Sequence, residues 1–382
     1  MELVFGIIVG ALILTILVVL HELGHAIVAR RNGVVVEEFG IGFPPKAWGK
    51  KLKNGILFTV NWLPLGGFVK LQGEHDAATG KGDYGAASFW VKTKILLAGV
   101  VINWLTAVVL LAVLAVTGLP QVIPNQFSIA SDTTTVTQPV TLSTVTKDSP
   151  AEKAGLQKND AIIRFGGEEV PTAQSLVSKA AERKGQTVEV IYDRNGREQR
   201  TDVTLRGDND NNKGYLGVGT AQQSYTQATW SAPIVGVVLT GQLTTETFKG
   251  LGSLVGNFGG GLLSQLSGND KTREAGNKEL AAAGDSVAGP VGILGVLFPA
   301  AQQAGLSYLV LISALISLTL AVMNVLPIPA LDGGRWFTMA AFRLFKRKLT
   351  EEREEKIQAA GFLTLMALVV VVTVLDVSKL IK

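Results

Sequence analysis

The segment His21-Glu22-Leu23-Gly24-His25 combines two histidines four residues apart with a glutamate beside the first. Positions i and i+4 lie on one face of a helix, so both imidazoles can bind a single metal ion. Glu22 then lies next to that ion, where its carboxylate can accept a proton from a metal-bound water. The spacing therefore predicts a zinc site in which His21 and His25 are ligands and Glu22 is the catalytic acid and base.

A catalytic zinc site also needs a third protein ligand and an open position for water. The chain has no Cys, which excludes thiolate ligands, so any metal must be held by His and carboxylates. The third histidine, His75, has polar neighbours in a loop. We expect His75 to be an exposed loop residue and not a further ligand.

Asp332 is the candidate third ligand, in residues 324–334 with the sequence NVLPIPALDGG. Pro327 and Pro329 stop a helix and impose extended backbone. We expect Gly333-Gly334 to permit a tight turn that aims the carboxylate back into the protein. The alternative is an Asp that caps the next helix.

The chain that carries these residues is hydrophobic, with a mean hydropathy of +0.32 and 17% charged residues. Soluble domains average about 25% charged residues, so a purely soluble enzyme is disfavoured. A net charge of +4, without a basic stripe and interleaved aromatic residues, excludes a nucleic-acid partner. Four apolar runs could cross about 30 Å of hydrocarbon as helices. They are residues 3–20, 95–119, 308–326 and 362–375, the last of which is short unless it extends over 359–377. The first run lacks the charged start and cleavage site of a signal peptide, so we expect it to be retained.

Lys and Arg are concentrated between the first and second runs and between the third and fourth. By the positive-inside rule both loops are cytoplasmic, which places both termini and residues 120–303 outside. His25 and Asp332 then emerge on the same cytoplasmic side, which a simple capping role for Asp332 does not explain. The remaining alternative is a His pair that only faces lipid headgroups. It is disfavoured because ionisable residues beside a span are costly and usually functional.

Residues 126–219 predict a separate domain of short strands, with Asn195-Gly196 at a hairpin turn. The stretch 146–167, TKDSPAEKAGLQKNDAIIRFGG, resembles the PDZ modules of bacterial membrane and periplasmic proteases. In that pattern Ser-Pro-Ala opens a short helix, Ala-Gly-Leu closes it, and a strand follows Asp160. PDZ modules bind peptide ends by adding a strand to a sheet edge. A spacer or size filter that binds no peptide is an equally open alternative.

Three features together resemble the site-2 protease family of intramembrane zinc metalloproteases, peptidase family M50, most closely its RseP-like bacterial branch. They are HELGH in the first run, NVLPIPALDGG after the third, and the PDZ-like insert. Lesser matches are GIGFPP at 40–45 with the family's membrane-associated β element, 63–74 with its PxGGxVKxxGE loop, and 98–104 with its AGPxxNF pattern. In the last, Val100 stands where Pro is usual and Trp104 where Phe is usual. RseP-like relatives often carry two PDZ modules, whereas this chain has one recognisable module.

The resemblance implies a polytopic α-helical membrane protein of about four transmembrane helices, with a membrane-associated β element and an inserted mostly-β PDZ-like domain. Four parts are expected along the chain. Residues 1–119 carry the first two transmembrane helices, HExxH and the β loop, and 126–219 the extracytoplasmic PDZ-like domain. Residues 228–303 form amphipathic interfacial helices and a loop, and 304–382 the last two transmembrane helices with the LDGG motif.

The resemblance also implies a set of site residues. It implies Zn2+ bound by His21, His25 and Asp332, with Glu22 as general base and acid. It implies contacts to the substrate from Asn103, Asn324, Gly66, Gly67 and Phe68.

The implied activity is cleavage of single-span membrane proteins in the bacterial plasma membrane, after a first extracytoplasmic cut. Anti-sigma factors are the leading substrate class and signal-peptide remnants the next. One alternative is a catalytically silent membrane scaffold that holds peptides with its PDZ-like domain, which would need neither HExxH nor Asp332. Another is a metal-dependent hydrolase of a small molecule or lipid, against which the PDZ-like insert argues.

Overall fold

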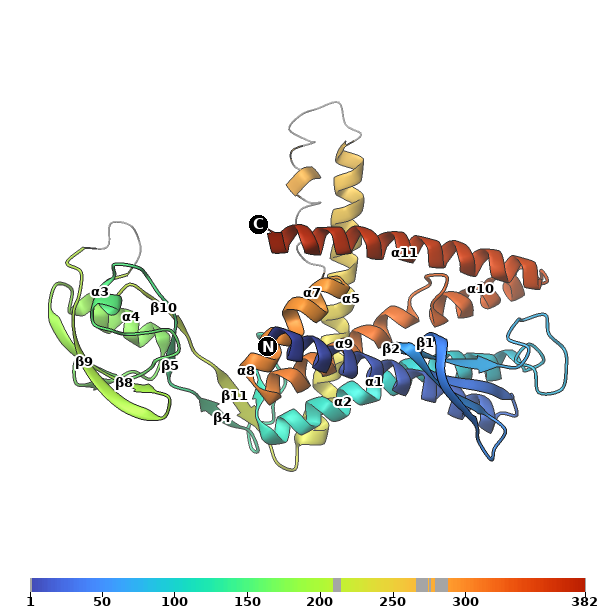
Figure 1. The fold of residues 1–382 in the computed structure, drawn as a ribbon, viewed down its shortest axis with the longest axis horizontal. Coiled ribbons are helices and arrows are strands. Elements are labelled where there is room, and N and C mark those ends of the chain that lie inside the picture. Colours follow the sequence, from blue (N-terminus) through green and yellow to red (C-terminus); the bar gives the residue numbers. More distant parts are fainter. Residues whose placement is uncertain (1, 209–213, 266–273, 275, 279–287, 382) are drawn as a thin grey trace. The chain divides into compact units, whose positions relative to one another are not determined.

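A computed structural model of the protein describes residues 2–208, 214–265, 274, 276–278 and 288–381. The chain forms two compact units (Figure 1). Unit 1 comprises Met1–Thr117, Gln126–Ile129 and Trp230–Lys382, and unit 2 comprises Gly118–Asn125 and Ala130–Thr229.

Unit 1 has, among the described residues, four helices long and apolar enough to cross a membrane, which confirms the four predicted spans. They are α1 (Glu2–Arg31), α2 (Phe89–Thr117), α9 (Leu306–Val325) and α11 (Glu351–Ile381). The first helix continues about three turns beyond the expected end at Leu20, because no Gly or Pro turn interrupts it before Gly33. The HExxH segment therefore lies inside α1.

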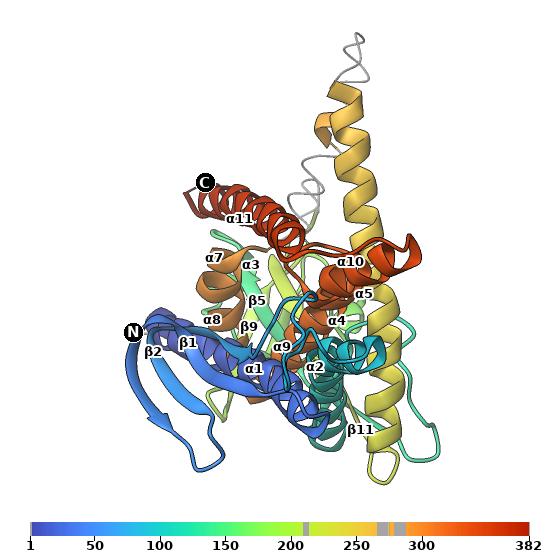
Figure 2. The same cartoon turned by 90° about the vertical axis from the view of Figure 1, so that its right-hand side faces the viewer.

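The second helix, α2, is the centre of unit 1 and contacts α1, α9 and α5 (Ala232–Gln265). The hydroxyl of Ser317 in α9 donates a hydrogen bond to the carbonyl of Asn103 in α2 at 2.8 Å. Figures 1 and 2 both show α5 crossing α2 steeply. Close approach depends on Gly236, because a Cβ there would lie 2.7 Å from the Val108 carbonyl oxygen.

The β element of unit 1 consists of β1 (Val36–Lys51) and β2 (Leu57–Leu71), which pair antiparallel. Gly40 lies opposite Phe68, and Ile41 lies opposite Gly67. Figure 2 shows this sheet lying along α1. Gly66 has a positive φ of 81°, and this left-handed residue suits a bend in β2 beside α1.

Short helices complete unit 1. They are α7 (Pro290–Gly292), the π-helix η1 (Ile293–Leu297), α8 (Phe298–Ala304) and α10 (Asp332–Leu344). The loop expected within 228–303 lies largely in 266–273, 275 and 279–287, outside the described residues.

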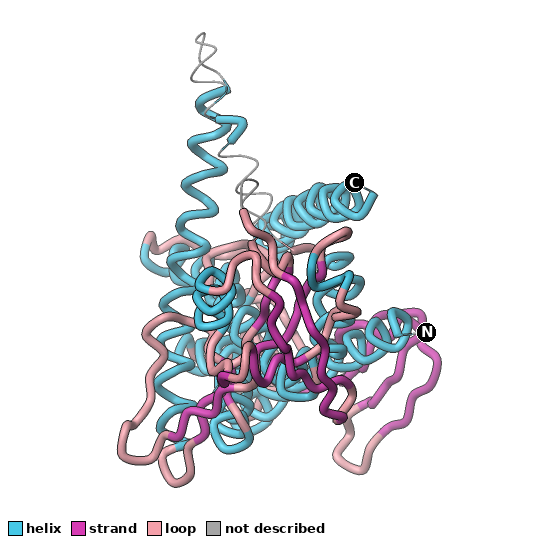
Figure 3. The backbone as a smooth tube through the Cα atoms, turned by 90° about the vertical axis from the view of Figure 1, so that its left-hand side faces the viewer, coloured by secondary structure: helices cyan, strands magenta, loops and turns pink. Residues whose placement is uncertain are grey.

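Unit 2 is mostly β, as predicted, and Figure 3 shows its strands. A six-stranded sheet runs in the order β10-β5-β6-β8-β9, with β7 paired to β6, and a three-stranded sheet runs β3-β11-β4. The strands are β3 (Leu119–Pro120), β4 (Thr134–Thr137), β5 (Val140–Val145), β6 (Ala161–Phe165), β7 (Glu168–Glu169), β8 (Thr187–Arg194), β9 (Arg197–Thr204), β10 (Val218–Ala221) and β11 (Ser224–Gln227). Helices α3 (Pro150–Lys153) and α4 (Ala173–Glu182) accompany the larger sheet.

The local signals of the PDZ-like stretch are confirmed. Ser149 caps α3 through a hydrogen bond from the Glu152 backbone N–H, and Gly155 follows the helix with φ +78°. Asn195 and Gly196, between β8 and β9, both have positive φ, as a two-residue hairpin turn requires.

Candidate active site

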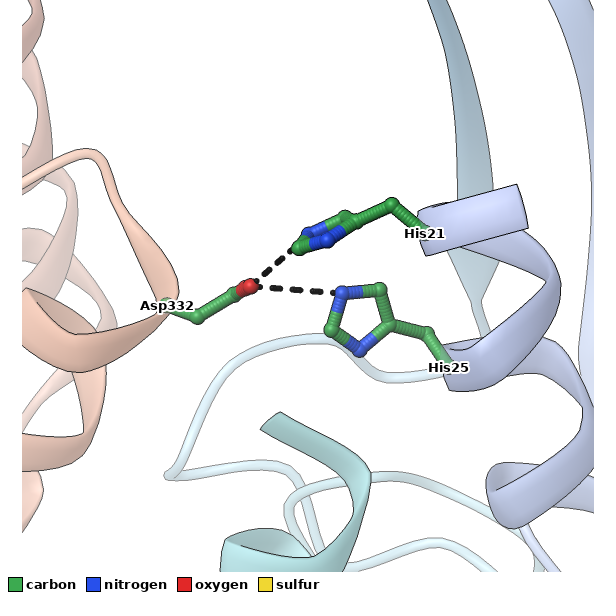
Figure 4. A group of neighbouring side chains, drawn as sticks. All are labelled: His21, His25 and Asp332. Atoms are coloured by element: carbon green, nitrogen blue, oxygen red, sulfur yellow. Dashed lines mark hydrogen bonds and ion pairs between the residues drawn. The ribbon is translucent and has the colours of Figure 1, made fainter. Parts of the chain in front are cut away.

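Figure 4 shows His21 and His25, from two successive turns of α1, pointing toward Asp332 at the first position of α10. The His21 Nε2 atom lies 3.0 Å from the Asp332 Oδ2 atom, and the His25 Nε2 atom lies 3.3 Å from the same oxygen. Both histidines are buried, with 7% and 6% of their surface exposed. The structure therefore brings together the three residues predicted to be zinc ligands.

Neighbouring groups fix both imidazole rings. The His25 Nδ1 atom lies 2.7 Å from the Ile95 carbonyl oxygen, which can only accept, so Nδ1 carries the hydrogen and Nε2 is free to bind a metal. The His21 Nδ1 atom lies 3.2 Å from the Asn103 amide. In each ring Nε2 thus faces Asp332, while Nδ1 contacts a neighbouring group, the Ile95 carbonyl for His25 and the Asn103 amide for His21.

Gly99 of α2 lies directly against this pair. A Cβ at Gly99 would lie 2.5 Å from the His25 Nε2 atom and 2.6 Å from the His21 Cε1 atom. Real Cβ atoms do not approach other atoms so closely, so the space that the glycine leaves is occupied by the two rings.

The three side chains fit a zinc ion. Their donor atoms lie within 4.8 Å of one another. In a tetrahedron with bonds of about 2.0–2.1 Å, ligand atoms are roughly 3.4 Å apart, close to the separations across Asp332. Two imidazole nitrogens and one carboxylate form a known catalytic zinc donor set that leaves a fourth position open.

The segment before Asp332 explains where its carboxylate lies. α9 ends at Val325, and residues 326–331 return the chain to α10. The expectation that Gly333-Gly334 form a tight turn is wrong, because both lie in the first turn of α10. Their small size is needed there, since a Cβ on either would collide with carbonyl oxygens of Val325 and Ile328.

Glu22 borders a cavity of about 740 Å³ that His25 and Asp332 also line. Its Oε2 atom accepts a hydrogen bond of 3.1 Å from the Val69 backbone N–H of β2. This contact orients the carboxylate and leaves Oε1 for a reacting group. A substrate in this cavity would therefore be next to Glu22 and to two of the predicted zinc ligands, His25 and Asp332.

The predicted substrate residues are divided between two places. Phe68 lines the cavity, and Gly67 lies beside Glu22, because a Cβ at Gly67 would be 3.9 Å from the Glu22 Cγ atom. Gly66 lies next to them in β2. Asn103 and Asn324 are not among the residues that line this cavity.

The two asparagines instead contact helix atoms. Asn103 is 1% exposed and faces His21, and its Oδ1 atom has no hydrogen-bond partner among the described residues. The Asn324 amide donates to the Leu320 carbonyl of its own helix at 3.0 Å.

Sequence reasoning missed Arg335, which lies one turn after Asp332 on α10. Its guanidinium donates to the Glu354 carboxylate at 3.1 Å and to Glu74, and it lies 4.6 Å from the Tyr84 ring centroid. Burial raises the pKa of Tyr84 above its ordinary value, so the phenol stays neutral. The three-residue spacing from Asp332 could have indicated that Arg335 lies near the site on the same helix. Its partners Glu74 and Glu354 could not be inferred, because they lie in distant parts of the sequence.

His75 forms part of a second group with Glu351 and Glu355. Its Nε2 atom lies 3.2 Å from a Glu351 carboxylate oxygen, and its side chain is 37% exposed. His75 is therefore a partly exposed loop residue that does not join the His21, His25 and Asp332 group.

Comparison with known proteins gives a family match over most of the chain and relatives that are similar over nearly their full length. A sequence model described as peptidase family M50 matches residues 9–368. The zinc metalloprotease RasP of Geobacillus kaustophilus is 26% identical, over 95% of this chain and 95% of that protein. The regulator of sigma-W protease RasP of Bacillus subtilis is also 26% identical, over 95% of this chain and 96% of that protein.

Among solved structures, the PDZ domain of an SdrC-like protein from Listeria monocytogenes covers 22% of this chain and 88% of its own. Its sequence identity is 21% and its TM-score 0.20, a likeness too low to add to the fold described above.

Proposed function

The chain belongs to peptidase family M50 and is a zinc metalloprotease with several membrane spans, and from this premise we propose that it cuts single-span membrane proteins within the bilayer. The observation that carries the proposal is the burial of His21 and His25 in α1, a helix long and apolar enough to cross a membrane, with the Asp332 carboxylate 3.0 Å and 3.3 Å from their Nε2 atoms. Ionisable side chains in such helices are costly and usually functional.

In this proposal His21, His25 and Asp332 hold the zinc ion. Zinc supplies a Lewis acid that polarises a peptide carbonyl and makes a bound water acidic. Glu22 accepts the proton at Oε1 and returns it to the leaving nitrogen, while the Val69 N–H holds its Oε2. In this proposal Glu22 is the one carboxylate that accepts the proton of the attacking water.

Substrate is proposed to add as a strand to the second half of β2. A transmembrane helix hides its carbonyls in its own hydrogen bonds, so it must unwind before cleavage, and its freed backbone needs new partners. Phe68, Val69, Lys70 and Leu71 of β2 line the cavity next to Glu22, and a strand edge supplies such partners. Gly67 allows β2 to approach β1 closely, because a Cβ there would lie 2.9 Å from the Gly40 carbonyl oxygen.

Asn103 is proposed to orient His21. Metal binding at the His21 Nε2 atom leaves the hydrogen on Nδ1, and the Asn103 amide oxygen can accept it after a 180° rotation of the amide. Removing such a partner typically costs about 10–100-fold in metal affinity or activity. Asn103→Leu is expected to reduce cleavage by this factor, and an unchanged rate would contradict the role. Asn324 remains a proposed groove contact.

The substrates are proposed to be anti-sigma factors or signal-peptide remnants left by a first extracytoplasmic cut. The name of the Bacillus subtilis relative, regulator of sigma-W protease, supports the first class. The PDZ-like unit is proposed to bind peptide ends at a sheet edge or to exclude large ectodomains. The test compares cleavage of matched substrates with and without a large ectodomain. Slower cleavage of the substrate that carries the ectodomain supports size exclusion, and equal rates contradict it.

The Lys and Arg distribution supports a topology with both termini and unit 2 outside the cytoplasm. Because the chain has no Cys, single cysteines report on it without background. In intact spheroplasts, a membrane-impermeant maleimide is expected to label Arg197→Cys in unit 2, and to label Lys53→Cys only after lysis. The reverse labelling pattern would mean that unit 2 lies in the cytoplasm and that the proposed topology is wrong.

The central experiment uses the purified full chain and a model single-span substrate. Glu22→Gln is expected to abolish cleavage while zinc content, measured by mass spectrometry, stays at the wild-type level. Glu198→Gln, at an exposed glutamate of unit 2, is the matched control and is expected to keep both. If wild type and Glu22→Gln both leave a panel of such substrates intact, the silent scaffold replaces the protease.

A further inference from the structure

Unit 1 contains a second cavity, of about 510 Å³, which shares no lining residue with the cavity at Glu22. Its walls are the loop before α2 with the first turn of α2, the last turns of α10, and the connection from α10 to α11. Figure 2, which faces this end of unit 1, shows α10 beside the first turns of α2. We call this the basic cavity.

The basic cavity carries an excess of positive charge. Four cationic side chains line it against one carboxylate, Asp76, and they are Lys92, Arg343, Arg347 and Lys348. Lys92 is buried and forms an ion pair with Asp76. For the other three, the described residues provide no ion-pair partner in the structure. Like charges gathered around one space repel unless an anion or solvent compensates them.

The walls of the basic cavity are fixed by contacts between α10 and α2. The Arg343 guanidinium lies 5.2 Å from the Phe89 ring centroid, a cation–π contact that holds it over the start of α2. The Trp336 indole donates to the Thr93 hydroxyl at 2.9 Å. Ser88, which lines the cavity, precedes α2, and the first N–H groups of a helix add partial positive charge.

We propose that the basic cavity binds the phosphate group of an anionic phospholipid headgroup. α2 begins at Phe89 and α11 at Glu351, so the two helices that carry the second and fourth proposed spans both begin at this cavity. In α2 the apolar run starts at Ile95, about two turns after the helix begins at the cavity, which places the cavity next to the membrane interface. Basic pockets at this level of membrane proteins recognise anionic headgroups.

The surface around the cavity supports a lipid source for the phosphate. Trp90 and Leu344 are 72% and 77% exposed, and each adjoins in sequence a residue that lines the cavity; Phe345, which follows Leu344, is 71% exposed. Large apolar and aromatic side chains beside basic ones are typical of the membrane interface. A soluble phosphate compound has the same anionic group but no acyl chains to contact these side chains.

Occupancy has a mechanical consequence for the active site. A phosphate bound by Arg343 and Arg347 on one side and by Lys92 of α2 on the other would connect the end of α10 to the start of α2. Asp332 begins α10, and Ile95 of α2 orients His25. The ligand is therefore expected to stabilise the native arrangement in proportion to its binding.

The test measures the thermal unfolding midpoint of the purified full chain in detergent with increasing phosphatidylglycerol, phosphatidylcholine or inorganic phosphate. Phosphatidylglycerol is expected to raise the midpoint, and phosphatidylcholine is not. In Arg343→Gln/Arg347→Gln the half-saturating concentration of phosphatidylglycerol is expected to rise at least about tenfold. The control Arg30→Gln/Arg31→Gln removes the same charge from the exposed last turn of α1 and is expected to behave as wild type.

Both replaced arginines are exposed, so the variant is expected to fold, and its retained unfolding transition checks this. The milder Lys348→Gln, with bound lipids counted by native mass spectrometry, gives an independent measurement and is expected to lose bound phosphatidylglycerol. An equal phosphatidylglycerol response in wild type and both cavity variants overturns the site. A midpoint shift by inorganic phosphate at the same half-saturating concentration overturns the lipid assignment and makes the ligand a soluble phosphate. Cleavage is not measured, so the outcome is independent of the protease proposal.

Discussion

Unit 1 brings histidine and carboxylate groups together at two places among its described residues. The two groups are His21, His25 and Asp332, and His75, Glu351 and Glu355. In each, the donor atoms lie within 4.8 Å of one another. In the first group both histidines are buried and the Asp332 side chain is 20% exposed, whereas in the second the Glu351 side chain is 63% exposed.

The lesson of the comparison is that donor type and spacing do not by themselves make a metal site. In the buried group a carbonyl and an amide orient the rings, and Gly99 leaves the space in which they lie. In the exposed group the His75 ring forms an ion pair with the Glu351 carboxylate at 3.2 Å. Exposed side chains keep their rotamer freedom and their water until a metal orders them, which lowers affinity.

The largest expected effect tests this difference directly. Asp332→Ala removes one of three ligands, so zinc affinity is expected to fall by more than the roughly 100-fold that loss of an outer contact costs. Glu351→Ala is the matched control and is expected to retain the full zinc content. Zinc per protein after dialysis against a weak chelator measures both. Equal zinc loss in the two variants would break the comparison.

A smaller effect is expected from Gly99→Ala, which leaves every ligand in place. The added methyl group would lie 2.5 Å from the His25 Nε2 atom, so both rings must shift. Zinc affinity and cleavage are expected to fall about 10–100-fold, as for other losses of ligand orientation. Gly252→Ala is the control, because nothing lies within 4 Å of a Cβ there. Wild-type zinc binding in Gly99→Ala would contradict the role of this space.

These residues also mark how far sequence reasoning reached. The His21 and His25 pair follows from helix periodicity, and the helix that Pro327 ends follows from proline chemistry, because both are local. Gly99 could be matched to a family pattern, but its role depends on which side chains occupy the space beside it. Ligand pairing across hundreds of residues has no local signal.

The interior of the LDGG segment shows the same limit. The glycines after Asp332 were expected in a turn, since glycine is typical of turns. The structure instead has them in a helix, packed against carbonyl groups of the preceding segment. The glycines are needed for their small size against these carbonyl groups and not for the conformational freedom from which the turn was predicted.

An intermediate effect is expected at Arg335, which supports the buried group without belonging to it. Arg335→Gln removes the charge that joins α10 to Glu354 and Glu74, so Asp332 is expected to lose part of its positioning. Cleavage is expected to slow about tenfold, mainly in kcat, with zinc retained. Arg335→Lys, which keeps the charge, is expected to recover part of the rate. A change confined to KM would assign Arg335 to substrate binding instead.

Unit 2 repeats the contrast between buried and exposed charge without any metal. The Asp160 carboxylate is 1% exposed and accepts two hydrogen bonds of 2.7 Å from Arg194. Glu168 is 52% exposed at its side chain and pairs with Lys179 and Arg183. Removing one partner of a buried pair typically costs about 3–5 kcal/mol, whereas exposed pairs contribute little.

The smallest expected effect is therefore the pH dependence of the Glu168 pair. Hydrogen bonds from Lys179 and Arg183 hold the pKa of Glu168 below its ordinary value. A lowered folded-state pKa gives stability that is present above the unfolded pKa of about 4.3 and is lost as the pH falls through the folded pKa. Glu168→Gln is expected to accelerate hydrogen exchange in β6 and α4 of the full chain slightly at pH 7, and progressively less as the pH falls through the lowered pKa of Glu168. Asp160→Asn should accelerate the same amides far more at pH 7, because it leaves Arg194 without its buried partner. Equal acceleration by the two variants would mean that burial does not set the strength of these pairs, and the argument that separates the two histidine groups would fail with it.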